Sequence, residues 1–298
     1  MTRFLKDIQD PNSIITAIDN SARFPEILTI LQKKYDTDIS LFRKLIAASD
    51  STATLLGKIR SKDLSASQRM SLLKMFRRCV SPVIDTEMAK KINKVSTENL
   101  VANYGHTFKE ISLLKSQFLD LPIDQTAALA ALIGEYDTRG QLGYKLTDQF
   151  FNWFESKFGE VFTINGPRGA GRDIELSTIF SDFIGGYPCD FIIRDKKNSE
   201  VLAIGFARYD ATRGGAQSDD RTGGNSDKVS KARDYLALSK EIRTSFRILF
   251  ISDGPGLAHN DTWKEACILD GAWNGNVRVA TIKSATTHVT EAWIRGIK

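Results

Sequence analysis

The sequence predicts an α/β protein with a helical amino-terminal half and a mixed β-sheet flanked by helices in the carboxyl-terminal half. From about Ser21 to Thr147, apolar residues recur three and four positions apart, which is the spacing of one helix face. After roughly residue 148, short apolar runs alternate with glycine-rich turns, as they do in sheets. We therefore expect a mostly helical region at 1–147 and an α/β region at 148–298.

Four stretches of the amino-terminal half carry the helical period: FPEILTILQKKY, ISLFRKLIAAS, SLLKMFRRCV and TFKEISLLKSQFLDL. Residues that cap helices mark three starts. Asp38 precedes the second stretch, Ser65 is followed by Gln68 in the spacing of a capping box, and Asp124 precedes QTAALAALIGEY. These positions predict where three of the helices begin.

The carboxyl-terminal half predicts four strands with helices between the later ones. First comes the aromatic helix DQFFNWFESKFGEVF, whose rings cover more than one face and predict burial against a sheet. The predicted strands are CDFIIRD at 189–195, VLAIGFARYD at 201–210, FRILFISD at 246–253 and VRVATIK at 277–283, and the predicted helices are 226–243 and 261–271. Two strands joined tightly, and later strands joined through helices, predict a mixed sheet.

Composition excludes several classes of protein. The 298 residues can bury a substantial core without disulfides. The three cysteines, Cys79, Cys189 and Cys267, lie far apart and lack zinc-ligand spacing. No run approaches the ~20 apolar residues of a membrane span, and the amino terminus has no apolar signal region, so we expect a soluble, cytoplasmic protein. The net charge of +5 weakly indicates a polyanionic partner.

One acidic residue stands out in the second half. Asp190 opens a hydrophobic strand directly after the tripeptide YPC that contains Pro188, and Glu175 lies upstream on a predicted helix. This order, continued by strand, helix, strand, helix and strand, resembles the PD-(D/E)xK nuclease superfamily of type II restriction endonucleases. The resemblance covers about residues 145–285. It implies an active site with Asp190 as a metal ligand and Glu175 as a supporting acid.

The second strand departs from that family. In the family this strand reads apolar, apolar, Glu, x, Lys, but here it reads AIGFARYD, with Gly205 in place of the Glu and Ala207 in place of the Lys. Three explanations remain open: both residues are engineered inactivating changes, or the site has moved to Arg208 and Asp210, or the domain binds DNA without cutting it. The stretch is also similar to a recurring restriction-enzyme motif, GFARYD followed by RGG.Q.DDR.GG, and this similarity implies that both residues are native.

The segment RYDATRGGAQSDDRTGGN favours relocation of the site. It gathers charged and amide side chains between two Gly-Gly pairs, and glycine lets backbone approach a ligand closely. The candidates in it are Asp210, Arg213, Gln217, Asp219, Asp220 and Arg221. A flexible surface loop rich in turn-forming residues is the alternative interpretation.

A second glycine-rich turn, INGPRGAGRDIELS at 164–177, carries Arg168 and Arg172. It lacks the GK[ST] ending of a nucleotide-binding P-loop. Two arginines on such a turn suit a DNA phosphate or a guanine edge. Alternatively, the turn caps a helix with Asp173, and the arginines are solvated.

Other candidate sites are weaker. Asp195 lies in a predicted hairpin turn, where aspartate is common, and Glu200 begins the second strand. The three histidines, at 106, 259 and 288, lack the spacing of HNH or zinc-protease motifs, and no GxSxG indicates a serine hydrolase.

Hydrolysis of a phosphodiester by water needs a divalent metal, and Mg²⁺ is held by one or two carboxylates with waters and phosphate oxygens. The resemblance therefore implies Mg²⁺-dependent, sequence-specific cleavage of double-stranded DNA. We expect Asp190 with Asp210, or with the Asp219/Asp220 pair, to bind the metal, and Arg208 or Arg213 to stabilise phosphate. The expected DNA-binding residues are Arg168, Arg172, Arg213, Gln217 and Arg221.

The same interpretation implies partners. Cutting both strands of a symmetric site favours a homodimer, a companion DNA methyltransferase is expected to act separately, and basic helical faces at 1–147 support DNA binding or dimerisation. Two rivals stay open: a DNA-binding protein with a decayed nuclease fold, and an RNA nuclease or nucleotide hydrolase.

Overall fold

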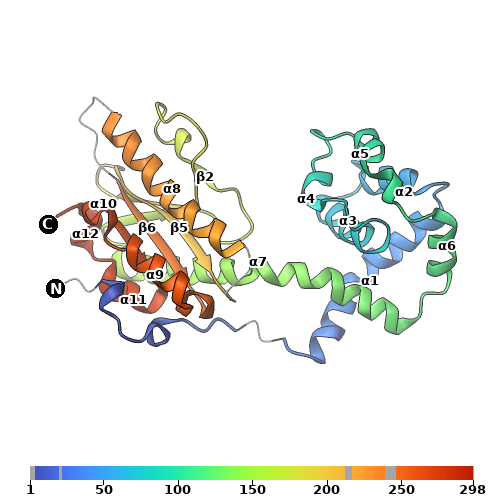
Figure 1. Cartoon of the computed structure of the whole chain (residues 1–298), viewed down its shortest axis with the longest axis horizontal. Helices are drawn as coiled ribbons and strands as arrows, with labels where there is room; N and C mark the ends of the chain where they lie inside the picture. The colour runs from blue at the N-terminus through green and yellow to red at the C-terminus, as the bar shows by residue number, and fades with distance from the viewer. Residues whose placement is uncertain (1–3, 20–21, 212–216, 239–245, 298) are drawn as a thin grey trace. The chain divides into compact units, whose positions relative to one another are not determined.

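The computed structural model describes residues 4–19, 22–211, 217–238 and 246–297, with the side chains at 136–140 and 217–223 left out. Mixed α/β architecture is confirmed. Two compact units form, one from 21–139 and the other from 1–20 together with 140–298. The predicted boundary at 147/148 thus lies inside helix α7 (Ile123–Phe158), which runs from one unit into the other (Figure 1). Residues 1–20 belong to the sheet-containing unit and not to the helical one.

The helical unit comprises α1 (Glu26–Ala47), α2 (Thr52–Ile59), α3 (Ala66–Cys79), α4 (Thr86–Ala89), α5 (Thr97–Tyr104), α6 (Ile111–Leu119) and the first part of α7. The capping box at α3 is confirmed, because the Gln68 N–H donates to Ser65 Oγ at 3.2 Å and the Ser65 N–H donates to Gln68 Oε1 at 3.1 Å. The predicted start at Asp38 is wrong, since α1 passes through it unbroken.

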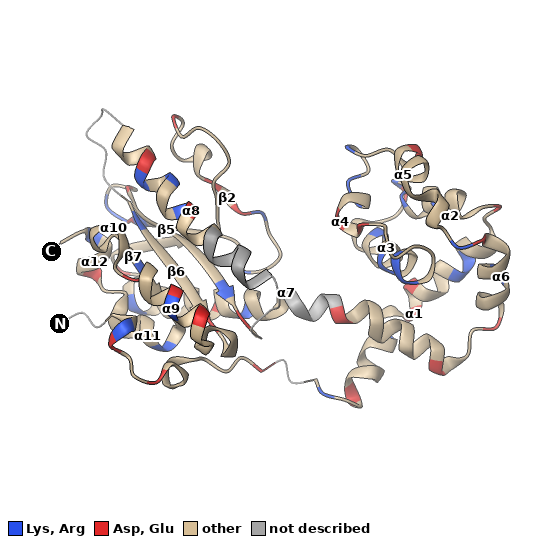
Figure 2. Ribbon diagram, viewed as in Figure 1, with Lys and Arg blue, Asp and Glu red and all other residues tan. Residues whose placement is uncertain are grey.

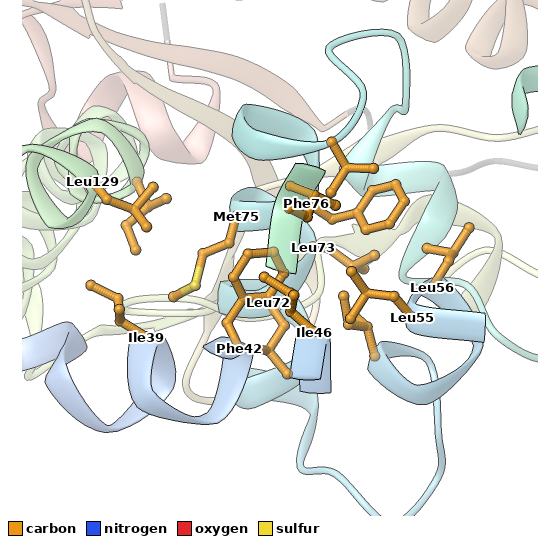
Figure 3. Packing of buried hydrophobic residues seen from close by; sticks show 14 of the residues in the cluster. Ile39, Phe42, Ile46, Leu55, Leu56, Leu72, Leu73, Met75, Phe76 and Leu129 are labelled. Carbon is orange, nitrogen blue, oxygen red and sulfur yellow. The ribbon is translucent and has the colours of Figure 1, made fainter. Parts of the chain in front are cut away.

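The core of the helical unit is aliphatic and aromatic. Phe42 of α1 and Phe76 of α3 are fully buried, together with the leucines of α2 and α3 (Figure 3). Two arginines of the basic helical stretches bind main-chain carbonyl groups within this unit. Arg60 is buried and donates to Ala89 O at 2.9 Å, and Arg77 Nη1 donates to Ile84 O at 3.1 Å. These two guanidinium groups stabilise loops by satisfying carbonyl groups.

The sheet has five strands in the order β1-β4-β5-β6-β7. They are β1 (Phe162–Asn165), β4 (Phe191–Asp195), β5 (Val201–Tyr209), β6 (Arg247–Asp253) and β7 (Val277–Ala280). β1, β4 and β5 are antiparallel, whereas β5, β6 and β7 are parallel. The four predicted strands are confirmed, and the edge strand β1 is an addition. A separate hairpin pairs β2 (Ile174–Glu175) with β3 (Pro188–Cys189).

Helices cover both faces of the sheet (Figure 1). On one face, α8 (Gln217–Leu238) and α9 (Asn260–Leu269) pack through Val229, Ala232, Ala266 and Leu269. The opposite face carries the aromatic end of α7, α11 (Ile282–His288) and α12 (Glu291–Arg295), and α10 (Ala272–Gly275) precedes β7. The predicted aromatic helix therefore buries its rings on the sheet. None of the helices in the described ranges is both long and apolar enough to span a membrane.

The amino-terminal segment is tied to the sheet by one fully buried carboxylate. Asp253, at the end of β6, accepts three main-chain hydrogen bonds: Oδ1 from Thr16 at 2.8 Å and Gly254 at 2.7 Å, and Oδ2 from Ile282 at 2.9 Å. Tyr209 adds a fourth hydrogen bond to the amino-terminal segment, because its hydroxyl donates to Thr16 O at 3.1 Å. These bonds join β5, β6, α11 and the first twenty residues into one unit.

His288 ends α11 and is buried. Its Nδ1 lies 3.1 Å from Ser284 O, and its Nε2 is buried without a hydrogen-bond partner among the described residues. Burial lowers the pKa of His288, the charge of Asp270 opposes this, and the charge of Arg278 adds to the lowering. A proton on Nε2 would thus be bound more weakly in the folded than in the unfolded protein.

We expect this histidine to make the protein less stable in mild acid. Below the unfolded histidine pKa of about 6.5, the unfolded chain binds the proton first, so the free energy of unfolding falls by up to about 1.4 kcal/mol per pH unit. Urea unfolding at several pH values should show this slope, and it should flatten in His288→Leu. Equal slopes in the wild type and in His288→Leu would contradict this role of His288.

Candidate functional site

Asp190 occupies the point where β4 begins beside β5. Its main-chain N–H donates to Gly205 O at 2.9 Å, and its Oδ2 accepts from the Ala207 N–H at 2.7 Å. The Asp190 carboxylate therefore accepts a main-chain hydrogen bond from β5, and this bond fixes its position. Its second oxygen, Oδ1, accepts no hydrogen bond from the described residues.

The register of β4 on β5 decides which side chains share a face with Asp190. Phe191 pairs with Gly205, so Asp190 lies opposite Phe206. Because side chains alternate along a strand, Phe206 and Arg208 face α8, whereas Gly205 and Ala207 face the aromatic end of α7.

The register places Gly205 and Ala207 on the face of β5 away from Asp190. At the positions that share a face with Asp190, this chain has a phenylalanine and an arginine. The equivalence of Gly205 with the family's Glu and of Ala207 with its Lys stays a prediction.

Gly205 itself has a packing role. A Cβ atom placed there would lie 2.0 Å from Cζ of Phe191, whose ring covers the glycine. We expect Gly205→Ala to destabilise the sheet unit by about 1–3 kcal/mol through overpacking. Gly143→Ala in α7, where a Cβ meets open space, is the matched control. Urea unfolding checks both, and unchanged stability of Gly205→Ala would contradict the packing.

Helix α8 places a lysine, Lys228, on the same face of β5 as Asp190. The Lys228 ammonium lies over the Phe206 ring, 3.7 Å from its centroid. Burial raises the pKa of Asp190 and lowers that of Lys228, although each charge favours ionisation of the other. The Asp173 charge also raises the pKa of Asp190. Burial thus outweighs the attraction between Asp190 and Lys228.

Glu175 does not lie on a helix as predicted. It ends the short strand β2, and its Oε2 accepts from the Tyr187 N–H at 3.0 Å. Tyr187 in turn donates from its hydroxyl to Lys228 O at 2.9 Å. Glu175 therefore fixes the β2–β3 segment, which anchors α8 at the residue that carries the ammonium.

Cys189, the neighbour of Asp190, is not a nucleophile. Its Sγ donates to Ile174 O at 3.2 Å, and burial together with the Asp190 charge raises the pKa of the thiol to about 12. The thiolate is consequently scarce at neutral pH, and thiolate is the reactive form.

Asp210 and Arg208 form a second pair farther along β5. Arg208 Nε donates to Asp210 Oδ1 at 2.8 Å, and Gly256 N–H donates to Asp210 O at 2.8 Å. Asp210 follows the end of β5 and lies four positions beyond Phe206, the residue opposite Asp190. The metal pair of Asp190 and Asp210 stays a prediction. Across the described residues, no group of three or more His, Cys, Asp or Glu side chains could hold a metal.

The predicted DNA-binding arginine at 168 is already paired. Its guanidinium donates to Asp148 Oδ1 at 3.1 Å and to Asn152 Oδ1 at 2.6 Å, and it lies over the Phe151 ring. These contacts fix the glycine-rich turn against α7. Arg172, on the same turn, is exposed to solvent.

The remaining candidates from the segment after β5 are only partly visible. Arg213 lies outside the described residues. The backbone of α8 begins at Gln217, so the part predicted as a loop is helical from there on, and the helix starts before the predicted 226. Four candidates have backbones on α8 and side chains outside the described part: Gln217, Asp219, Asp220 and Arg221.

The two rival acids have structural roles. Asp195 accepts from the Lys197 N–H at 2.7 Å and forms an ion pair with Arg295. Glu200 accepts from Asn198 in the same turn, at 3.1 Å. Both stabilise the β4–β5 hairpin at the end away from Asp190.

Comparison with known proteins gives no match. No family model, curated protein or solved structure matches this chain. The functional argument accordingly stands on the geometry around Asp190.

Proposed function

We propose that this protein is a Mg²⁺-dependent endonuclease that cuts double-stranded DNA at a specific sequence, in the manner of the PD-(D/E)xK restriction endonucleases. The observation that carries the proposal is the carboxylate of Asp190, held by one oxygen at the start of β4 with the other oxygen available. The order α7, β1, β4, β5, α8, β6, with β4 antiparallel and β6 parallel to β5, supports it.

The surroundings of Asp190 fit a divalent cation. A carboxylate that burial and the neighbouring Asp173 make costly to ionise gains from a positive charge at its open oxygen. Asp190 would hold Mg²⁺, for which one or two carboxylates suffice when substrate phosphate completes the shell. The bound ion would activate water and offset charge on the phosphate.

The protein's own groups provide orientation and charge. Arg208 points from β5 on the Asp190 face, and Asp210 holds its guanidinium through Nε. Its remaining N–H groups are suited to a phosphate oxygen. Arg172, exposed on the glycine-rich turn, would contact the DNA backbone. The proposal includes action as a homodimer in the cytoplasm, with a separate DNA methyltransferase as its companion.

A second candidate function is DNA binding without cleavage. The scarcity of carboxylates near Asp190 favours it, since within the described residues no cluster of three metal-binding side chains exists. This candidate predicts sequence-dependent binding that does not depend on metal.

A substrate panel tests the proposal. The purified chain is incubated with duplex DNA, single-stranded DNA, RNA and nucleoside triphosphates, each with Mg²⁺ and with a chelator. We expect discrete fragments from duplex DNA with Mg²⁺ alone. A metal-independent gel shift with intact DNA would favour the binding protein, and hydrolysis of RNA or nucleotide alone would overturn the proposal.

A further inference from the structure

Lys228 carries the inference, and its position is unusual for a helix lysine. Helix α8 carries both acidic and basic residues (Figure 2). Asp227, Lys231 and Asp234 on this helix are exposed to solvent, whereas the ammonium of Lys228 lies over the ring of Phe206. That contact brings the ammonium to the face of β5 that Asp190 shares. The charges that act on Lys228 include those of Asp190 and Asp173.

Packing of α8 does not require this ammonium. The helix is held on the sheet by Val229 and Ala232, and the Tyr187 hydroxyl binds the main-chain carbonyl of residue 228. Placing an ammonium where burial disfavours its charge costs stability. This cost is offset when the ammonium binds an anion at that position.

The two residues of β5 on the Asp190 face are a buried aromatic ring and an arginine that is paired with another carboxylate. Phe206, opposite Asp190, is apolar and buried between Tyr187 and Phe250. Arg208 lies two residues farther along β5 and is held toward Asp210. Among the described basic side chains, the ammonium of Lys228 is the charge that favours ionisation of Asp190.

We propose that Lys228 is a catalytic residue whose ammonium contacts the phosphate bound beside Asp190 and stabilises the negative charge of the transition state. The inference rests on the proposed nuclease function. In the reaction, a water oxygen forms a bond to phosphorus and the bond to the leaving sugar oxygen breaks. The water gives one proton to solvent, and the leaving oxygen takes one from solvent. Lys228 stays protonated throughout and contributes fixed charge at the phosphate.

Single-turnover cleavage with enzyme in excess tests this role. Lys228→Met removes the charge and Lys228→Arg keeps it, while Lys231→Met, one turn along and exposed, is the matched control. We expect Lys228→Met to lower the cleavage rate constant by about 10²–10³-fold, as for other groups that stabilise transition-state charge. Lys228→Arg should keep more of the rate, and Lys231→Met should match the wild type.

Two further measurements separate catalysis from folding. DNA affinity without a cleaving metal and the thermal midpoint are recorded for each variant, and we expect Lys228→Met to keep both near wild type. Cleavage by Lys228→Met at the wild-type rate would overturn the role of Lys228 alone. A fall in the thermal midpoint without a lower rate constant for the folded fraction would overturn it as well. Failure of the wild-type protein to cut would overturn the proposed nuclease, and the inference with it.

Discussion

Asp190→Asn is expected to lower Mg²⁺-dependent DNA cleavage by more than about 100-fold, because loss of even an indirect metal contact typically costs about 10–100-fold. The amide keeps an oxygen that can accept the hydrogen bond from the Ala207 N–H, so the start of β4 should remain folded. The substitution removes the negative charge that would face the cation. Cleavage is measured as the single-turnover rate constant at saturating Mg²⁺.

Glu200→Gln is the matched control for that experiment. It removes one carboxylate from the same β4–β5 hairpin, where the oxygen accepts only from the Asn198 side chain in the turn. We expect Glu200→Gln to cut like the wild type. If Asp190→Asn cuts as fast as Glu200→Gln, Asp190 is not part of the active site.

Asp253→Ala is expected to cost the sheet unit about 4 kcal/mol or more of unfolding free energy. The carboxylate is fully buried and accepts main-chain hydrogen bonds from Thr16, Gly254 and Ile282. Each hydrogen bond to a charged group contributes about 1.5–3 kcal/mol, and removal leaves buried donors without acceptors. The loss should free the amino-terminal segment from the ends of β6 and α11.

Tryptophan fluorescence during urea unfolding reports this change selectively. All four tryptophans lie within the sheet-containing unit: Trp153, Trp263, Trp273 and Trp293. Asp227→Ala, an exposed aspartate on α8, should change the free energy of unfolding by less than about 0.5 kcal/mol. A similarly small effect for Asp253→Ala would contradict the role of Asp253 as an anchor.

The central elements of the fold were predictable because their patterns are strong. The four predicted strands are short apolar runs between turns, and each is present with small shifts at the ends. Weak patterns were missed: β1 and β2 are too short to show alternation, and Glu175 was therefore assigned to a helix. Asp38 was misread because aspartate also occurs inside long helices, where nothing forces a break.

The candidate site is centred on Asp190, which the sequence singles out because an acid that opens a buried strand is unusual. The face on which residues 205 and 207 lie could not be read from the motif, because it is set by pairing of Phe191 with Gly205, and a shift of one residue reverses every side chain. Lys228 is far from Asp190 in sequence, and only packing of α8 over Phe206 brings it near. No local sequence signal marks that contact.

Mapping of cut ends tests the central claim most directly. Phage DNA is incubated with the wild-type protein and Mg²⁺, and the ends of the fragments are sequenced. The Asp190-centred nuclease predicts one recurring sequence with a fixed cut position, absent when a chelator replaces the metal. DNA left intact with Mg²⁺, or the same ends produced by Asp190→Asn, would contradict it.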